Sequence, residues 1–131
     1  GVTKGELVGG NLSILYSLLG SKSSIDTKDK ILFIEDLDEY LYHIDRMMMA
    51  LKRAGKLKNL AGLLVGGMTD MKDNAIPFGK TAEEIIQEHV AEYDFPVAYQ
   101  FPSGHFEDNR AVFIGKNAHV NVEQTSSLFK Q

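Results

Sequence analysis

Runs of apolar residues alternate with amphipathic stretches along the chain. Residues 30–35 (KILFIE) and 60–68 (LAGLLVGGM) are almost continuously apolar and rich in residues that favour β-structure. Such runs predict strands that are covered on both faces of a sheet. Residues 5–10 (GELVGG) predict a shorter strand that ends in a glycine pair.

The segments that follow residues 5–10 and residues 30–35 are typical of helices. Asn11 is placed as the N-cap of a helix over residues 12–20, with Gly20 as the residue that ends it. A second helix should begin after Asp38 as its cap and end at Gly55. Its apolar residues recur at helical spacing, at Leu41, Ile44, Met48 and Leu51.

A third helix is predicted after a loop over residues 69–80. Thr81 and Glu84 have the spacing of a capping box, in which each side chain bonds the backbone N–H of the other residue. The helix should therefore begin after Thr81 and continue to about residue 93.

The C-terminal third favours β-structure. Residues 95–101 (FPVAYQF) and 110–115 (RAVFIG) are predicted strands, and residues 115–117 a turn into a further strand over 118–124. Strands that alternate with helices indicate the α/β class. We expect a single compact α/β domain with a mainly parallel sheet, flanking helices and a C-terminal β-hairpin, in the manner of a swivelling β/β/α domain.

Composition narrows the possible partners. The chain has 131 residues, of which 44% are apolar and 24% charged, as in an ordinary globular domain. Its net charge of −4, without a basic stripe, argues against nucleic acid as a partner. There is no cysteine, which excludes a disulfide framework, a thiolate nucleophile and a cysteine-based zinc site.

The pattern contains neither a membrane span nor a secretion signal, because no window approaches 18 apolar residues and no signal-like apolar segment leads the chain. We therefore expect no membrane partner and a cytoplasmic location. The chain begins at Gly1 rather than at an initiator methionine, which indicates either processing or a piece of a longer protein.

Two acids end the strand over residues 30–35. In α/β proteins ligands gather at the carboxyl ends of the strands, where Glu35 and Asp36 would lie. The alternative is that both acids begin a loop and help to cap the next helix through its dipole. Composition alone favours this second interpretation.

A histidine on a tight turn is the second candidate. Pro102, Ser103 and Gly104 would present His105 at the end of a predicted strand. A histidine on a turn and a glutamate at a strand end are two members of a nucleophile, base and acid constellation. His43 and His89 fall in predicted helices and His119 in a strand.

The third member, a nucleophilic serine, is not evident. No G-x-S-x-G elbow occurs, and Ser13 and Ser17 fall inside a predicted helix. Ser103 remains a candidate, although a turn former is its simpler role. The residues 8–11 (VGGN) could cradle an anion but lack a phosphate-binding pattern, so a tight turn is preferred. No spacing typical of metal ligands appears.

Four segments together resemble the C-terminal domain of the LD-carboxypeptidase family, which includes the microcin self-immunity peptidases. They are residues 5–15, 31–57, 60–68 and 101–120, in the same order and at compatible spacing. The resemblance implies that residues 1–131 form this C-terminal domain and that a preceding N-terminal domain carries the nucleophilic serine and its oxyanion hole.

By position, the resemblance makes Glu35 the acid and His105 the general base of a Ser-His-Glu triad, and it implies no cofactor. The full enzyme would release the terminal D-alanine of murein tetrapeptides during cell-wall recycling. Its partners would be its own N-terminal domain, the murein peptide and, if an apolar face is exposed, a second copy of the chain. The isolated domain should be inactive.

Two rival interpretations remain open. A non-catalytic module that binds a small anionic ligand or a peptide through the glycine turns predicts that Glu35 and His105 lie far apart or are buried in unrelated pairs. A self-contained hydrolase requires a serine such as Ser103 within hydrogen-bond reach of His105.

Overall fold

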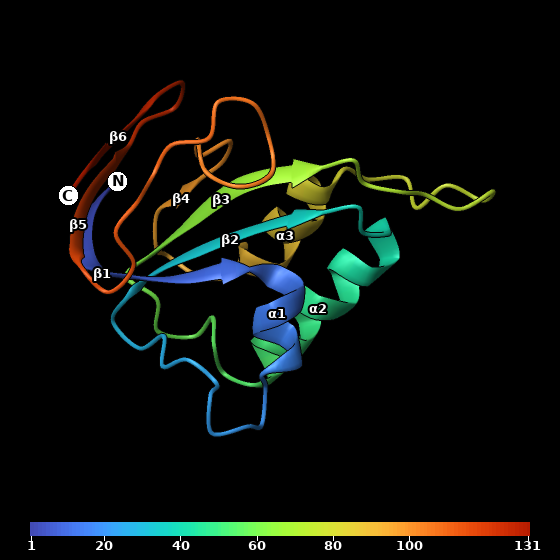
Figure 1. The fold of residues 1–131 in the computed structure, drawn as a ribbon, viewed down its shortest axis with the longest axis horizontal. Coiled ribbons are helices and arrows are strands. Elements are labelled where there is room, and N and C mark those ends of the chain that lie inside the picture. Colours follow the sequence, from blue (N-terminus) through green and yellow to red (C-terminus); the bar gives the residue numbers. More distant parts are fainter.

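The computed structural model describes residues 1–131, which form one six-stranded mixed sheet and three helices (Figure 1). The strands are β1 (Val2–Asn11), β2 (Ile31–Leu37), β3 (Gly62–Thr69), β4 (Val97–Ala98), β5 (Asn117–Val122) and β6 (Ser127–Lys130). The helices are α1 (Leu12–Ser17), α2 (Leu41–Arg53) and α3 (Ala82–Val90).

The sheet has the order β4-β3-β2-β1-β5-β6. Neighbours from β4 to β1 are parallel, whereas β5 pairs antiparallel with β1 and with β6. Strand β1 belongs to both parts, because residues 2–6 pair with β5 and residues 7–11 pair with β2. The predicted α/β domain with a mainly parallel sheet and flanking helices is confirmed.

Each face of the sheet buries its own apolar cluster. The larger cluster, of 17 buried residues, joins the strands to all three helices, including Leu12, Ile44 and Ile86. The smaller cluster, of 8 buried residues, lies on the opposite face and includes Phe33 and Phe101. Residues 31–34 of β2 are therefore covered on both faces of the sheet, as a continuous apolar run predicts.

The local signals for helix ends are mostly confirmed. The side chain of Asn11 accepts a hydrogen bond from the N–H of Ile14 and caps α1. Thr81 and Glu84 form both bonds of the capping box at α3. Gly55 follows α2 with a φ of 75°, a conformation that glycine adopts without a steric penalty.

Two predicted helix boundaries are wrong. Asp38 does not cap α2, because β2 continues to Leu37 and the N-cap is Tyr40, which makes no side-chain bond. Asp38 instead has a φ of 62° and pairs with Lys72 at 2.8 Å. Helix α1 ends at Ser17, so Gly20 lies in the turn beyond it rather than at its end.

The C-terminal strands also differ from prediction. Of residues 95–101 only Val97 and Ala98 form a strand, because they have two partners on β3 and Gln100 then turns to a φ of 54°. Residues 110–115 are not a strand. The C-terminal hairpin exists, but it joins β5 to β6 through residues 123–126.

The carboxyl ends of β1, β2 and β3 point toward the same edge of the molecule, and the loop over residues 70–80 projects beyond that edge (Figure 1). The first and last residues lie together at the opposite side, beside β5 and β6. None of the helices is both long and apolar enough to span a membrane.

Candidate active site

Glu35 and His105 meet at the carboxyl end of β2. Nδ1 of His105 lies 2.7 Å from Oε2 of Glu35, although 70 positions separate the residues in the chain. The glutamate side chain is 7% exposed and the histidine side chain 53% exposed. The carboxylate is thus buried at the edge of the sheet, and the imidazole separates it from solvent.

Glycines allow the turn that carries His105 to rest on the sheet. Strand β3 contains an irregularity at Gly66 and Gly67, and the N–H of Gly67 donates to the carbonyl of Ser103 over 3.2 Å. A Cβ at Gly66 would stand 2.3 Å from that carbonyl oxygen. Gly104 has a φ of 128°, and a Cβ there would lie 3.0 Å from Cβ of Glu35. Close packing of backbone on backbone therefore places the imidazole.

Asp36, the neighbour of Glu35, points to the other face of the sheet. Its carboxylate is 2% exposed and accepts hydrogen bonds from the N–H of Ser13 and from the side chain of Asn11. Asp36 therefore caps α1, the preceding helix, and not α2 as the capping interpretation predicted. The parallel pairing of β1 with β2 brings it there.

The hydrogen bond to Glu35 occupies Nδ1 of His105 and leaves Nε2 without a partner in the chain. A carboxylate bonded to one ring nitrogen selects the tautomer with the proton on that nitrogen and stabilises the imidazolium. Nε2 is then free to take a proton from a hydroxyl brought to the exposed face of the ring. The pair has the form of a general base with its orienting acid.

The other histidines serve the fold. His89 is 7% exposed, and its Nε2 lies 2.7 Å from Asp45, which ties α3 to α2. His43 in α2 pairs with Glu39, which lies just before the helix, also at 2.7 Å. His119 lies within β5, as predicted.

Ser103 does not join the pair. Its hydroxyl forms no hydrogen bond with His105, and its carbonyl oxygen is the group that bonds Gly67. The glycine turn at residues 8–11 offers no free anion cradle, because Asp36 takes the Ser13 N–H at the start of α1. No group of three or more potential metal ligands comes together.

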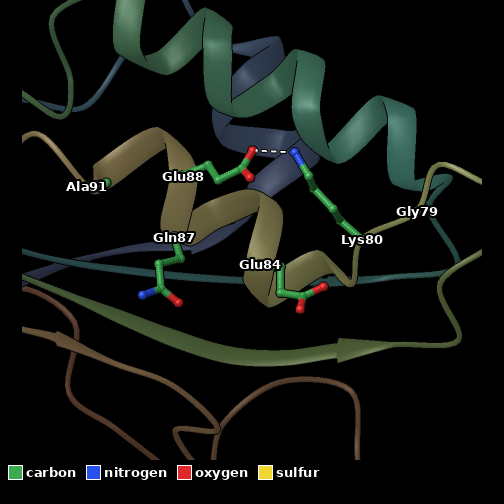
Figure 2. A pocket seen from close by; sticks show the side chains of 6 residues that line it. All are labelled: Gly79, Lys80, Glu84, Gln87, Glu88 and Ala91. Carbon is green, nitrogen blue, oxygen red and sulfur yellow. Dashed lines mark hydrogen bonds and ion pairs between the residues drawn. The ribbon is translucent and has the colours of Figure 1, made fainter.

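A hollow of about 410 Å³ lies along α3 and the end of the loop before it (Figure 2). Its charged groups already have partners: Lys80 and Glu88 pair at 2.7 Å, and Glu84 serves the capping box. We therefore do not assign chemistry to it.

Sequence reasoning missed the residues that build the site around the pair. Gly66 and Gly67 were expected only to end a strand, whereas they receive the His105 turn. The signal was available in the glycine pair at the end of an apolar run, since a glycine in a strand often marks a close approach of another backbone.

Comparison with known proteins identifies the family and the fold. Residues 4–120 match the family model described as LD-carboxypeptidase C-terminal domain. The chain belongs to the LD-carboxypeptidase family. A relative in Bacillus subtilis, a "Probable murein peptide carboxypeptidase", is 39% identical over 99% of this chain and 41% of its own length. The murein tetrapeptide carboxypeptidase of Pseudomonas aeruginosa is 30% identical over 88% of this chain and 37% of its own length.

Solved structures show the same architecture as this LD-carboxypeptidase chain. The crystal structure of muramoyltetrapeptide carboxypeptidase from Oxalobacter formigenes superposes with a TM-score of 0.88 at 27% identity, over 98% of this chain and 44% of that one. The microcin C7 self-immunity protein shares the fold, with a TM-score of 0.79 at 22% identity. The match covers 92% of this chain and 36% of that one. The LD-carboxypeptidase chain thus spans less than half the length of these relatives.

Proposed function

We propose that this chain supplies the base and the acid of a serine LD-carboxypeptidase, with His105 as general base and Glu35 as the acid that orients it. The observation that carries the proposal is the 2.7 Å contact between a buried carboxylate and an exposed imidazole at the carboxyl edge of the sheet. The substrate would be a murein tetrapeptide, from which the enzyme releases the terminal D-alanine in the cytoplasm during cell-wall recycling.

The nucleophilic serine would come from an N-terminal domain that packs against this edge. The relatives support such a partner, because this chain covers 41% of the Bacillus subtilis protein and 37% of the Pseudomonas aeruginosa protein. In the reaction, Nε2 of His105 would take the serine proton as the hydroxyl attacks the peptide carbonyl, and then give it to the leaving D-alanine amine.

The chain alone would lack the nucleophile and the oxyanion donors. Removing the serine or the histidine of a serine hydrolase costs on the order of 10⁶ in kcat. We therefore expect no D-alanine release from an L,D-tetrapeptide by the 131-residue chain, and release when a purified N-terminal serine domain is added. Turnover by the chain alone would overturn the division of the triad between two domains.

A non-catalytic binding module is the second candidate. It accounts for the exposure of His105, but it gives no reason for a buried carboxylate bonded to a single imidazole. The same assay separates the two functions, since a binding module would remain inactive after the N-terminal domain is added.

A further inference from the structure

His105 lies on a loop, because residues 99–116 form neither a strand nor a helix. The N–H of Arg110 donates to the carbonyl of Pro102 over 2.8 Å and closes residues 102–110 into one loop. The His105 side chain is 53% exposed, so packing around the ring fixes its position only in part. The backbone of the loop must supply the rest.

One peptide unit of this loop, between Ser103 and Gly104, is bonded at both ends. Its carbonyl oxygen accepts a hydrogen bond from the N–H of Gly67 over 3.2 Å, which ties the loop to β3. Its N–H donates to Oδ1 of Asn109 over 3.1 Å, and no backbone carbonyl accepts from it. The carbonyl and the N–H lie on opposite edges of a planar trans peptide. The two hydrogen bonds together therefore fix how that plane is turned.

The orientation of this peptide plane determines where the imidazole points. Gly104 has a φ of 128°, and rotation about the backbone bonds of a glycine meets little steric resistance. His105 is the central residue of a three-residue turn, in which the N–H of Phe106 donates to the carbonyl of Gly104 over 3.1 Å. A rotation of the Ser103–Gly104 peptide would therefore carry this turn with it and move the imidazole away from Glu35.

The site tolerates little displacement of this turn. A Cβ at Gly104 would stand 3.0 Å from Cβ of Glu35 and 3.1 Å from its Oε2, the oxygen that bonds Nδ1 of His105. Hydrogen bonds weaken steeply as their geometry departs from linear. The bond from Gly104 to Asn109 is exposed, so water can replace it as an acceptor. A mobile water, however, does not fix the direction of the peptide.

We propose that Asn109 is a positioning residue for the general base. Its Oδ1 holds the Ser103–Gly104 peptide plane in place and thereby keeps Nδ1 of His105 on the Glu35 carboxylate. The inference rests on the proposed peptidase function and adds a residue that acts through His105 without contacting the substrate. Aspartate offers an oxygen acceptor at the same position, whereas alanine offers none.

The test is the tautomer of His105, measured by NMR from the ring-nitrogen chemical shifts of the 131-residue chain at a pH where the imidazole is neutral. The unsubstituted chain should carry the proton on Nδ1 and none on Nε2. Asn109→Ala should give a mixture of both tautomers, because the net contribution of one hydrogen bond shifts an equilibrium about three- to tenfold. Asn109→Asp should restore the signals of the unsubstituted chain.

Asn121→Ala is the matched control, because Asn121 also makes one exposed side-chain hydrogen bond, to Glu123 over 3.3 Å, but on β5. It should leave the His105 signals unchanged. With the N-terminal domain supplied, Asn109→Ala should lower kcat for D-alanine release about three- to tenfold at an unchanged KM, because the base and not substrate binding is affected.

The proposal is overturned if Asn109→Ala keeps the ring-nitrogen shifts of the unsubstituted chain, if Asn121→Ala changes them equally, or if Asn109→Asp does not restore them. The tautomer is measured on the chain without catalysis. A failure of this test is therefore distinct from a failure to release D-alanine once the N-terminal domain is added.

Discussion

The contact between Glu35 and His105 joins a buried carboxylate to an exposed imidazole. Pairs between exposed groups contribute little to stability because water screens them. Glu35 is 7% exposed, and a hydrogen bond from Nδ1 of His105 is the one its carboxylate accepts in the chain. The imidazole is thus held in one orientation and one tautomer, which is what a general base requires.

Replacing Glu35 by glutamine tests this role. The Glu35→Gln side chain has nearly the same shape but can donate to Nδ1 and select the wrong tautomer. With the N-terminal domain supplied, we expect kcat for D-alanine release to fall on the order of 10⁴-fold. Glu39→Gln is the matched control, since Glu39 lies just before α2 and pairs with His43 at the same 2.7 Å. Equal losses in both variants would contradict a specific role of Glu35.

The raised pKa of Tyr99 predicts that the stability of the fold depends on pH. Its pKa is raised to about 12 from 10.0 by burial and by Glu83, so the folded state binds the phenolic proton more tightly than the unfolded state. This contribution to stability is complete below pH 10 and is lost as the pH rises toward 12. Ultraviolet difference titration should show one late tyrosine that is absent from Tyr99→Phe and titrates earlier in Glu83→Gln. An unchanged titration in Glu83→Gln would contradict the influence of that carboxylate.

The residues of the candidate site lie at the ends of strands and helices. Strand β2 carries Glu35 on one face and Asp36 on the other, so a single strand end supplies both the acid of the site and the cap of α1. The glycine irregularity in β3 gives the His105 turn its place. Helix α3 begins at the capping box of Thr81 and Glu84.

The β3 irregularity can be tested with Gly66→Ala. The new Cβ would stand 2.3 Å from the Ser103 carbonyl oxygen and 2.7 Å from the buried ring of Phe33, so the turn or the strand must shift. We expect the free energy of unfolding to fall by about 1–3 kcal/mol, measured by urea denaturation, and activity with the N-terminal domain to be lost. Gly79→Ala, with a strained φ of 88° but open space around it, should keep the activity.

The cap of α1 can be tested with Asp36→Ala. The substitution removes the acceptor for the Ser13 N–H and for the Asn11 amide, which are part-buried. Loss of a helix cap with part-buried donors left unpaired should cost about 1–3 kcal/mol in thermal or urea unfolding. A cost equal to that of an exposed substitution such as Thr125→Ala would contradict the capping role.

At the scale of the whole molecule, the candidate site is an edge and not an enclosed cleft. His105 is 53% exposed, and two aromatic side chains beyond the end of β2 are also exposed: Tyr40 at 39% and Tyr42 at 41%. Exposed apolar surface of this kind favours association with another chain. We propose that the N-terminal domain covers it and that a second copy can do so in its absence.

This arrangement predicts concentration-dependent self-association of the chain in sedimentation velocity. The double substitution Tyr40→Ser and Tyr42→Ser should weaken it, because the aromatic surface near the site edge is lost. Phe113→Ser, at a residue that is 62% exposed outside this segment, should not. Loss of association in Phe113→Ser alone would place the contact elsewhere.

The sequence by itself determined what depends on neighbouring residues. Apolar runs predicted β2 and β3, and the side chains of Asn11, Thr81 and Glu84 marked helix starts, because capping bonds span three residues. The resemblance named Glu35 and His105. Residues 110–115 have strand-like composition but no strand, since composition does not say which edge is available: β5 already pairs with residues 2–6 of β1.

Only the tertiary structure decided which distant groups meet. It placed Nδ1 of His105 at 2.7 Å from a carboxylate 70 positions away, and it turned Asp36 to cap a helix that precedes it in the chain. The physical reason is that packing, strand register and the approach of one backbone to another depend on contacts between distant residues. A local pattern of side chains does not specify those contacts.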